Sequence, residues 1–239
     1  DQTGSDPGRS ARRATNTEGD SMSMTVTSVH TAVTGLSLEP GTIVEGEDER
    51  KDDITGREYG IYRAAKNRHL IDECVSLLNR GGVAALVPTS ASAAYVETIA
   101  EQVEQFARTR STSTNASEGG VLALPTSGST GAPKLVALPV TGLAHFLNWG
   151  SEYFGFEDAT VSLSLSPWNF DVSFLDTWAV LVAGGTVVAA EAARLHDAAY
   201  LTRMLDEYRP TFVQVVPSTL DALLNAARDA EYPSVHDVV

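Results

Sequence analysis

The chain has few cysteines, few basic residues and no long apolar run, and each shortage excludes a class of protein. Its single cysteine, Cys74, excludes an intramolecular disulfide framework and any metal site built from several cysteines. Only 17 lysines and arginines stand against 31 aspartates and glutamates, which gives a formal net charge of -14. Such an acidic chain is a poor partner for nucleic acid, whose counterions are displaced by basic surfaces, and for anionic membranes.

The sequence does not indicate a membrane-spanning or exported protein either. No stretch approaches the roughly 18 consecutive apolar residues of a spanning helix, and no apolar run follows the N-terminal arginines as in a signal peptide. With its lone cysteine, the chain is therefore expected in the cytoplasm. Because it begins with Asp1 and not with methionine, two interpretations stay open: a fragment, or extra residues before a natural start at Met22 or Met24.

The N-terminal quarter differs in composition from the rest of the chain. Residues 1–20 are polar and lack helical or strand periodicity, and seven acids between Glu39 and Asp53 accompany only Arg50 and Lys51. This composition is typical of a solvated or disordered segment. We therefore expect a poorly ordered acidic segment over residues 1–58 and a folded domain over residues 59–239. An apolar content of 43% is sufficient for a sizeable core in that domain.

Beyond Tyr59, short apolar runs alternate with amphipathic segments. Strands are predicted at 83–87, 121–124, 135–138, 161–165, 186–190 and 211–216, and helices at 66–79, 92–108, 141–153, 172–183, 197–208 and 218–229. The Ser- and Thr-rich stretch 109–120 is predicted to be a linker or an exposed loop. The alternation predicts an α/β fold with a mainly parallel sheet flanked by helices.

The most informative segment lies between two predicted strands. It reads Thr126-Ser127-Gly128-Ser129-Thr130-Gly131-Ala132-Pro133-Lys134. Its hydroxyls and unhindered glycine amides can donate hydrogen bonds to phosphate oxygens, and Lys134 is the only lysine or arginine between Arg110 and Arg194. The alternative is a flexible turn, the usual meaning of a Gly/Ser cluster. The spacing matches neither a P-loop nor the nucleophile elbow of α/β-hydrolases.

The order of residues in this segment resembles the T-S-G-S-T-G-x-P-K signature of the adenylate-forming superfamily, a highly specific match. The superfamily includes acyl- and aryl-CoA ligases, luciferases and the adenylation domains of nonribosomal peptide synthetases. The resemblance implies the N-terminal part of the core domain of such an enzyme. It also implies that the β- and γ-phosphates of ATP contact Thr126, Ser127, Gly128, Ser129, Thr130, Gly131 and Lys134. Leu135 and Val140 depart from the residues common in the family without removing a phosphate donor.

A second match follows at the expected distance. The segment Ser166-Pro167-Trp168-Asn169-Phe170-Asp171-Val172-Ser173 resembles the F-D-x-S segment of amino-acid-activating members. In that subfamily the aspartate pairs with the α-ammonium group of the substrate. A carboxylate in a partly dry pocket needs a cationic partner, and a charge-assisted hydrogen bond contributes about 1.5–3 kcal/mol. The alternative is that Asp171 only caps the helix that follows it, and the two roles are compatible.

Further similarity narrows the subfamily. Phe146, Trp149 and the spacing F-D-x-S-x-x-D resemble D-alanine–carrier-protein ligases and related free-standing amino-acid-activating enzymes. The resemblance implies a set of substrate-binding residues, of which the last three face the substrate side chain: Phe170, Asp171, Val172, Leu175 and Gln214.

Other residues have plainer interpretations. Gln214 is polar within an apolar strand, so it either contacts a ligand or pairs internally. Trp149, Trp168 and Trp178 are predicted to pack in the core. The five histidines show no spacing typical of metal ligands.

The family resemblance implies a reaction that needs more than this chain. It implies ATP- and Mg²⁺-dependent activation of an amino acid as its adenylate, followed by transfer to the phosphopantetheine thiol of a carrier protein. Convincing similarity runs from about Val121 to Ala227. Family members continue with segments that bind adenine, ribose and Mg²⁺, and with a small domain that bears a catalytic lysine. We expect these beyond Val239, so that the fragment alone is inactive.

Two other functions stay open at this point. In an acyl- or aryl-CoA ligase, Asp171 would act only as a helix cap. A non-catalytic nucleotide-binding module, or one half of a split enzyme, would account for the expected absence of the C-terminal machinery.

Overall fold

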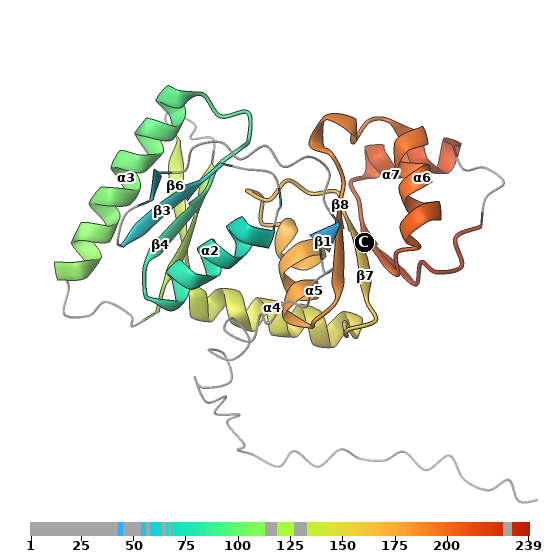
Figure 1. The fold of residues 1–239 in the computed structure, drawn as a ribbon, viewed down its shortest axis with the longest axis horizontal. Coiled ribbons are helices and arrows are strands. Elements are labelled where there is room, and N and C mark those ends of the chain that lie inside the picture. Colours follow the sequence, from blue (N-terminus) through green and yellow to red (C-terminus); the bar gives the residue numbers. More distant parts are fainter. Residues whose placement is uncertain are drawn as a thin grey trace, which may run out of the picture.

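Two β-sheets alternate with three layers of helices in the computed structural model (Figure 1). The structure describes residues 43–44, 54–55, 58–63, 66, 68–112, 119–126, 133–226 and 231–239. The first sheet has the order β2 (Ile54–Thr55), β3 (Tyr59–Tyr62), β4 (Val83–Leu86), β5 (Val121–Thr126) and β6 (Lys134–Pro139). The second has the order β1 (Ile43–Val44), β8 (Thr186–Ala189), β7 (Val161–Ser164), β9 (Phe212–Gln214) and β10 (Asp237–Val238).

Most strand pairings are parallel. Every pairing in the second sheet is parallel, as are β3–β4 and β4–β5 in the first. The edge pairs β2–β3 and β5–β6 are antiparallel. The predicted α/β fold with mainly parallel strands is therefore confirmed. Its division into two sheets was not predicted, because apolar runs show where strands lie and not which strands pair.

Helices cover both outer faces and fill the space between the sheets. Helix α3 (Ala93–Thr112) covers the first sheet, and α6 (Ala198–Tyr208) and α7 (Pro217–Ala226) cover the second (Figure 1). The central layer holds α2 (Arg68–Asn79), α4 (Val140–Phe154), the π-helix η1 (Phe174–Ala179) and α5 (Val180–Val182). A short 3₁₀-helix η2 (Ala192–Arg194) precedes α6. Helix α4 carries the chain from the first sheet to the second.

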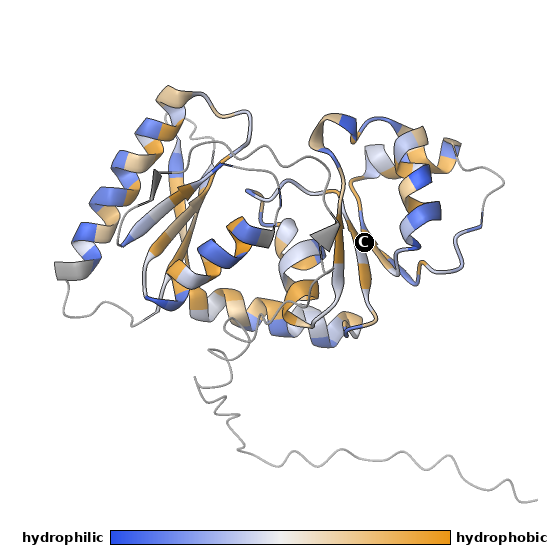
Figure 2. Ribbon diagram, viewed as in Figure 1, coloured by the Kyte–Doolittle hydropathy of each residue, from blue (hydrophilic) through white to orange (hydrophobic). Residues whose placement is uncertain are grey.

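Three apolar cores hold the layers together: one beneath α3, one around the central helices, and one beneath α6 and α7. Leu122 of β5, Leu147 of α4 and Phe212 of β9 belong to the central core, which thereby joins both sheets. Hydrophobic residues concentrate on the strands and on α4, whereas α3 and α6 mix hydrophilic and hydrophobic positions, as expected of helices with one face in water (Figure 2). Among the described residues, no helix combines the length and the apolar character needed to cross a membrane.

Most predicted elements lie within a few residues of their expected bounds, with two informative differences. Helix α3 extends to Thr112, so the predicted linker 109–120 begins too early. An ion pair of Arg108 with Glu104 and a hydrogen bond from Thr109 Oγ1 to the carbonyl of Gln105 continue the helix there. In addition, β1 and β2 lie within the segment 1–58; the rest of that segment, apart from Glu58, is outside the described residues, and its predicted disorder stays a prediction.

The C-terminal end of α2 shows how closely the chain packs around a glycine. Gly81 adopts a left-handed conformation (φ 81°) after the helix, and its N–H donates to Leu78 O at 3.0 Å. Gly120 approaches the same residue, because a β-carbon there would lie 2.2 Å from Leu78 O and 2.6 Å from Leu78 Cα. Backbone cannot move aside as a flexible side chain can, so only glycine fits.

We therefore expect Gly120→Ala to lower the free energy of unfolding by about 1–3 kcal/mol, the usual cost of overpacking. The matched control is Gly142→Ala in α4, where a β-carbon meets nothing within 4 Å. That change is expected to raise stability by up to about 1 kcal/mol through helix propensity. Chemical denaturation of the three proteins checks both signs, and a Gly120→Ala variant as stable as wild type would contradict the close approach.

Candidate functional site

The predicted substrate residues belong to the carboxyl end of the second sheet. In this sheet the chain passes from β7 to β8 on one side and then crosses back to β9 on the other side of β7, so the order of strands reverses between β7 and β9. Open parallel sheets bind ligands beyond the carboxyl ends of their strands at such a switch point. Asp171 lies in the connection that leaves β7, and Gln214 is the last residue of β9. One residue therefore follows the first of the two strands that flank the switch point, and the other ends the second strand.

Asp171 is exposed, and hydrogen bonds hold the main chain around it in place. The Ser173 hydroxyl donates to the carbonyl oxygens of Trp168 and Phe170, at 3.0 and 2.7 Å. The carboxylate Oδ1 of Asp171 accepts a hydrogen bond from the adjacent Val172 N at 3.0 Å, whereas a helix cap would accept one from the second or third residue after it. The second carboxylate oxygen has no hydrogen-bond partner among the described residues, so it is available to a ligand cation.

The helix predicted over 172–183 forms, but most of it is not an α-helix. Residues Phe174–Ala179 form a π-helix, and α5 continues it for three residues. All six side chains of the π-helix are buried between α4 and the second sheet. Hydrophobic periodicity cannot separate a π-turn from an α-turn when every residue is buried. Such turns are rare and occur frequently at functional sites.

The apolar residues around Asp171 divide into two groups. Phe170 and Val172 are exposed, by 53% and 40% of their surface. Leu175 is buried in the central core against α4, where a β-carbon on Gly150 would lie 2.8 Å from Leu175 Cδ1. Phe170 and Val172 are thus exposed while Leu175 is buried, and substrate contact by all three stays a prediction.

Gln214 presents an unsatisfied acceptor. Its Oε1 is buried and has no hydrogen-bond partner in the described part of the chain. Gln214 pairs in the sheet with Ser164, the last residue of β7, and residues paired in this way direct their side chains to the same face of the sheet. A buried acceptor without a partner costs about 1–3 kcal/mol, which a ligand donor would recover. Internal pairing of this oxygen, one of the two alternatives, is therefore not found within the described residues.

Two of the three tryptophans lie in the core as predicted. Trp168 and Trp178 are buried, with ring centroids 5.7 Å apart. The prediction for Trp149 is wrong, because 50% of its surface is exposed. Helix α4 buries a different stripe, and Trp149 lies on its opposite side, where it stacks with Tyr153 at 5.4 Å.

The sequence analysis did not predict the buried ion pair between Lys66 and Asp176, which contacts the connection between β7 and η1. Lys66 Nζ lies 3.8 Å from Asp176 Oδ1, and the two side chains are 8% and 0% exposed. Lys66 Nζ also donates a hydrogen bond to Ser164 Oγ. Burial lowers the pKa of the Lys66 amine, and the carboxylate of Asp176 offsets part of that shift. The sequence did contain one signal: Asp176 is the only charge in an apolar run, and a buried charge requires a partner.

The ends of the predicted phosphate loop lie together on the first sheet. Thr126 and Lys134 are directly opposite each other at the end of the β5–β6 pair, and both are exposed. Thr126 Oγ1 donates to Lys134 O at 3.3 Å, and Gln102 of α3 donates through Nε2 to Pro133 O at 3.2 Å. The other predicted phosphate ligands lie outside the described residues: Ser127, Gly128, Ser129, Thr130 and Gly131.

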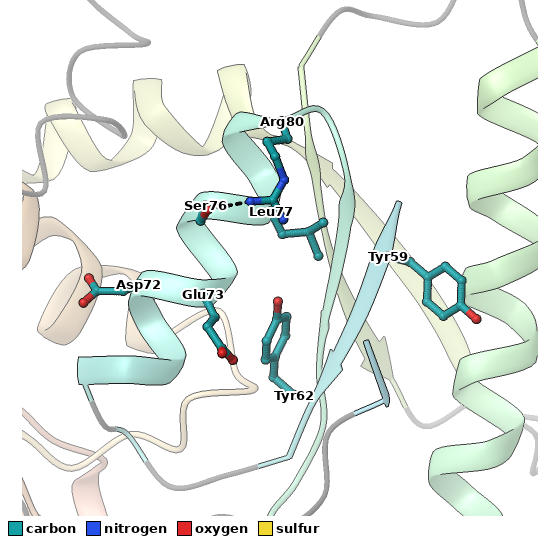
Figure 3. Close-up of a pocket in the computed structure, with 7 residues that line it drawn as sticks. All are labelled: Tyr59, Tyr62, Asp72, Glu73, Ser76, Leu77 and Arg80. Atoms are coloured by element: carbon teal, nitrogen blue, oxygen red, sulfur yellow. Dashed lines mark hydrogen bonds between the residues drawn. The ribbon is translucent and has the colours of Figure 1, made fainter. Parts of the chain in front are cut away.

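One cavity of about 400 Å³ lies elsewhere, between α2 and β3 (Figure 3). Its lining is Tyr59, Tyr62, Asp72, Glu73, Ser76, Leu77 and Arg80, and in it Arg80 Nη1 donates to Ser76 Oγ at 2.6 Å. None of the predicted site residues lines this cavity, so it does not locate the chemistry. No group of three or more metal-ligating side chains occurs among the residues that the structure describes.

Comparison with known proteins agrees with the resemblance found in the two motifs. Residues 55–239 match the model of a family described as AMP-binding enzyme. The chain is 34% identical to tyrocidine synthase 3 of Brevibacillus parabrevis over 99 residues, which is 41% of this chain and 2% of that protein. It is 42% identical to a D-alanine–D-alanyl carrier protein ligase of Lacticaseibacillus rhamnosus over 64 residues, which is 27% of this chain and 13% of that one.

Solved structures show the same fold. A crystal structure of the nonribosomal peptide synthetase FmoA3 matches with a TM-score of 0.58 at 19% identity, over 87% of this chain and 24% of that one. A four-domain nonribosomal peptide synthetase bound to AMP and glycine matches with a TM-score of 0.57 at 16% identity, over 83% of this chain and 16% of that one. The chain therefore spans a small part of each of these four relatives, between 2% and 24% of their length.

Proposed function

The chain belongs to the AMP-binding enzyme family, and on that premise we propose that it takes part in the ATP-dependent activation of an amino acid. In this reaction a carboxylate oxygen of the amino acid attacks the α-phosphorus of ATP, and the bond to pyrophosphate breaks. The thiol of a carrier-protein phosphopantetheine then attacks the acyl carbon, and AMP leaves. Asp171 binds the α-ammonium group, and Phe170, Val172, Leu175 and Gln214 contact the rest of the substrate.

The single observation that carries the proposal is Asp171 at the switch point. The carboxylate is exposed in the connection that follows β7, with one oxygen bonded by Val172 N and the other without a hydrogen-bond partner among the described residues. A fixed carboxylate is a suitable partner for an ammonium group, because the ion pair also makes hydrogen bonds. The unsatisfied Oε1 of Gln214 on the flanking strand supports a polar contact nearby.

Phosphate binding is assigned to the loop between β5 and β6. Lys134 and Thr126 are exposed and lie opposite each other where this loop leaves the sheet, so they present a cation and a hydroxyl there. These residue types suit the triphosphate of ATP, and Ser127, Gly128, Ser129, Thr130 and Gly131 are proposed to complete the site. Mg²⁺ would neutralise phosphate charge when bound. The family resemblance implies that its ligands and the catalytic lysine lie in segments that follow the two motifs in family members.

The experiment is an ATP–pyrophosphate exchange assay on the full-length protein, screened with amino acids and with acids that lack the α-amino group. We expect exchange with one or a few amino acids and none with their 2-deamino counterparts. Exchange supported only by acids without an amine would contradict the proposal.

One observation favours a second candidate, an acyl- or aryl-CoA ligase. The hydrogen bond from Val172 N to Asp171 Oδ1 is a local contact with the adjacent residue, which needs no ligand. In that case coenzyme A would be the thiol acceptor, and the same screen would detect exchange with acids that lack an amine.

A further inference from the structure

The buried ion pair Lys66–Asp176 connects the first sheet's half of the molecule, from β2 to β6, with the second sheet's half, from β7 onward. Lys66 belongs to the connection between β3 and α2, beside the first sheet. Asp176 lies in η1, which packs against β7 and β9 of the second sheet. The Lys66 ammonium contacts both Asp176 Oδ1, at 3.8 Å, and the hydroxyl of Ser164 at the end of β7. The Lys66 side chain thus contacts both η1 and β7.

Stability is a weak explanation for charges in this position. The neighbouring side chains of η1, Leu175 and Trp178 among them, belong to the apolar central core. Replacing a buried ion pair by apolar residues of similar volume is often neutral or stabilising, because both charges lose their hydration. What a buried pair imposes is geometry, since only one arrangement of the two elements satisfies both charges.

Asp176 also makes hydrogen bonds that fix the position of the connection in which Asp171 lies. Its Oδ2 accepts a hydrogen bond from Ser166 N at 3.2 Å, and its main-chain oxygen accepts one from the hydroxyl of Ser162 at 2.7 Å. Thr177 Oγ1 donates to Oδ1 at 2.8 Å, which fixes the carboxylate from a third side. The connection is thus held at Ser166 by Asp176, and at its other end by the hydroxyl of Ser173.

We propose that Lys66 is a positioning residue that, through Asp176, aligns the amino-acid half-site of the second sheet with the phosphate half-site of the first. The inference rests on the proposed function, in which Asp171 holds the amino acid and Lys134 the ATP phosphates. The attacking carboxylate must meet the α-phosphorus in line. A displacement of about 1 Å between the two half-sites is enough to cost about 10²-fold in rate.

The test uses four variants of the full-length protein. Lys66→Met removes the charge and keeps an unbranched side chain, and Lys66→Arg keeps the charge. The double variant Lys66→Met/Asp176→Leu removes both charges, so that no unpaired charge is left in the core. Arg108→Met is the matched control, because it breaks the exposed ion pair with Glu104 on α3, 76% and 40% exposed. Exchange kinetics give kcat and the separate KM values for amino acid and ATP, and thermal unfolding gives the midpoint.

We expect the double variant to unfold near the wild-type midpoint while kcat/KM for the amino acid falls at least about tenfold and the KM for ATP changes less than about twofold. Lys66→Met should show the same kinetic loss, Lys66→Arg a smaller one, and Arg108→Met none. Wild-type kinetics in the folded double variant would overturn the positioning role alone. Absence of amino-acid-dependent exchange in the wild type would overturn the proposed function, and this inference with it.

Discussion

Asp171→Asn is expected to lower kcat/KM for the amino acid by about 10- to 150-fold, because a lost charge-assisted hydrogen bond costs about 1.5–3 kcal/mol. Asparagine is a more specific test of the negative charge than alanine would be at this position. Its side-chain oxygen can still accept the hydrogen bond from Val172 N, and asparagine caps helices as well as aspartate does. The change therefore removes the charge and keeps the local structure. Exchange kinetics with one amino acid and its 2-deamino counterpart measure the effect.

The preference for the amino acid over its 2-deamino counterpart is the quantity that separates the two roles of Asp171. If the carboxylate binds ammonium, the preference falls in Asp171→Asn and the free energy of unfolding changes little. Asp158→Asn, at an exposed position in the turn before β7, is the matched control and should leave the preference unchanged. A wild-type preference in Asp171→Asn would mean that Asp171 only caps the connection.

Lys134→Ala is expected to raise the KM for ATP and to lower kcat/KM for ATP by about 10- to 150-fold, again from loss of a charge-assisted contact. Lys134 is exposed at the start of the edge strand β6, so its removal should not lower the stability of the fold. The loss should be smaller at high salt, because salt screens exposed charges. Exchange kinetics at two ionic strengths, with ATP varied, check both statements.

A matched control for Lys134→Ala is Arg203→Ala, which removes an exposed cation from α6 on the far side of the second sheet. We expect the control to leave the KM for ATP unchanged. Equal effects of the two substitutions would show a general response to net charge and would contradict a phosphate contact by Lys134.

Local patterns in the sequence predicted the elements well. Apolar runs such as Val83–Leu86 became buried strands, and the stripe Leu70, Cys74, Leu77 and Leu78 became the buried face of α2. These outcomes depend on periodicity, which is a property of neighbouring residues. The two motifs placed the candidate site in the same local way, because Asp171 lies in the connection that follows β7 and Lys134 is the first residue of β6.

Features that depend on distant residues escaped prediction. The exposure of Trp149 depends on which face of α4 meets the sheets, and the aromatic residues of this helix are spread over more than one face. The π-turns of Phe174–Ala179 lie in a run whose six residues are all buried, so the sequence pattern predicted a helix without showing its type. Lys66 and Asp176 are 110 positions apart in the sequence, so no local pattern connects them. A charged residue inside an apolar run indicates that the folded protein provides a partner for it, but it does not show which residue that partner is.

A competition experiment tests the central claim, ammonium recognition during adenylation, most directly. The full-length protein is incubated with ATP, Mg²⁺ and an equimolar mixture of the preferred amino acid and its 2-deamino counterpart, and the adenylates formed are identified by mass spectrometry. We predict the aminoacyl-adenylate as the dominant product in the wild type and a reduced share of it in Asp171→Asn. Comparable amounts of both adenylates in the wild type, or a dominant 2-deamino product, would contradict the account.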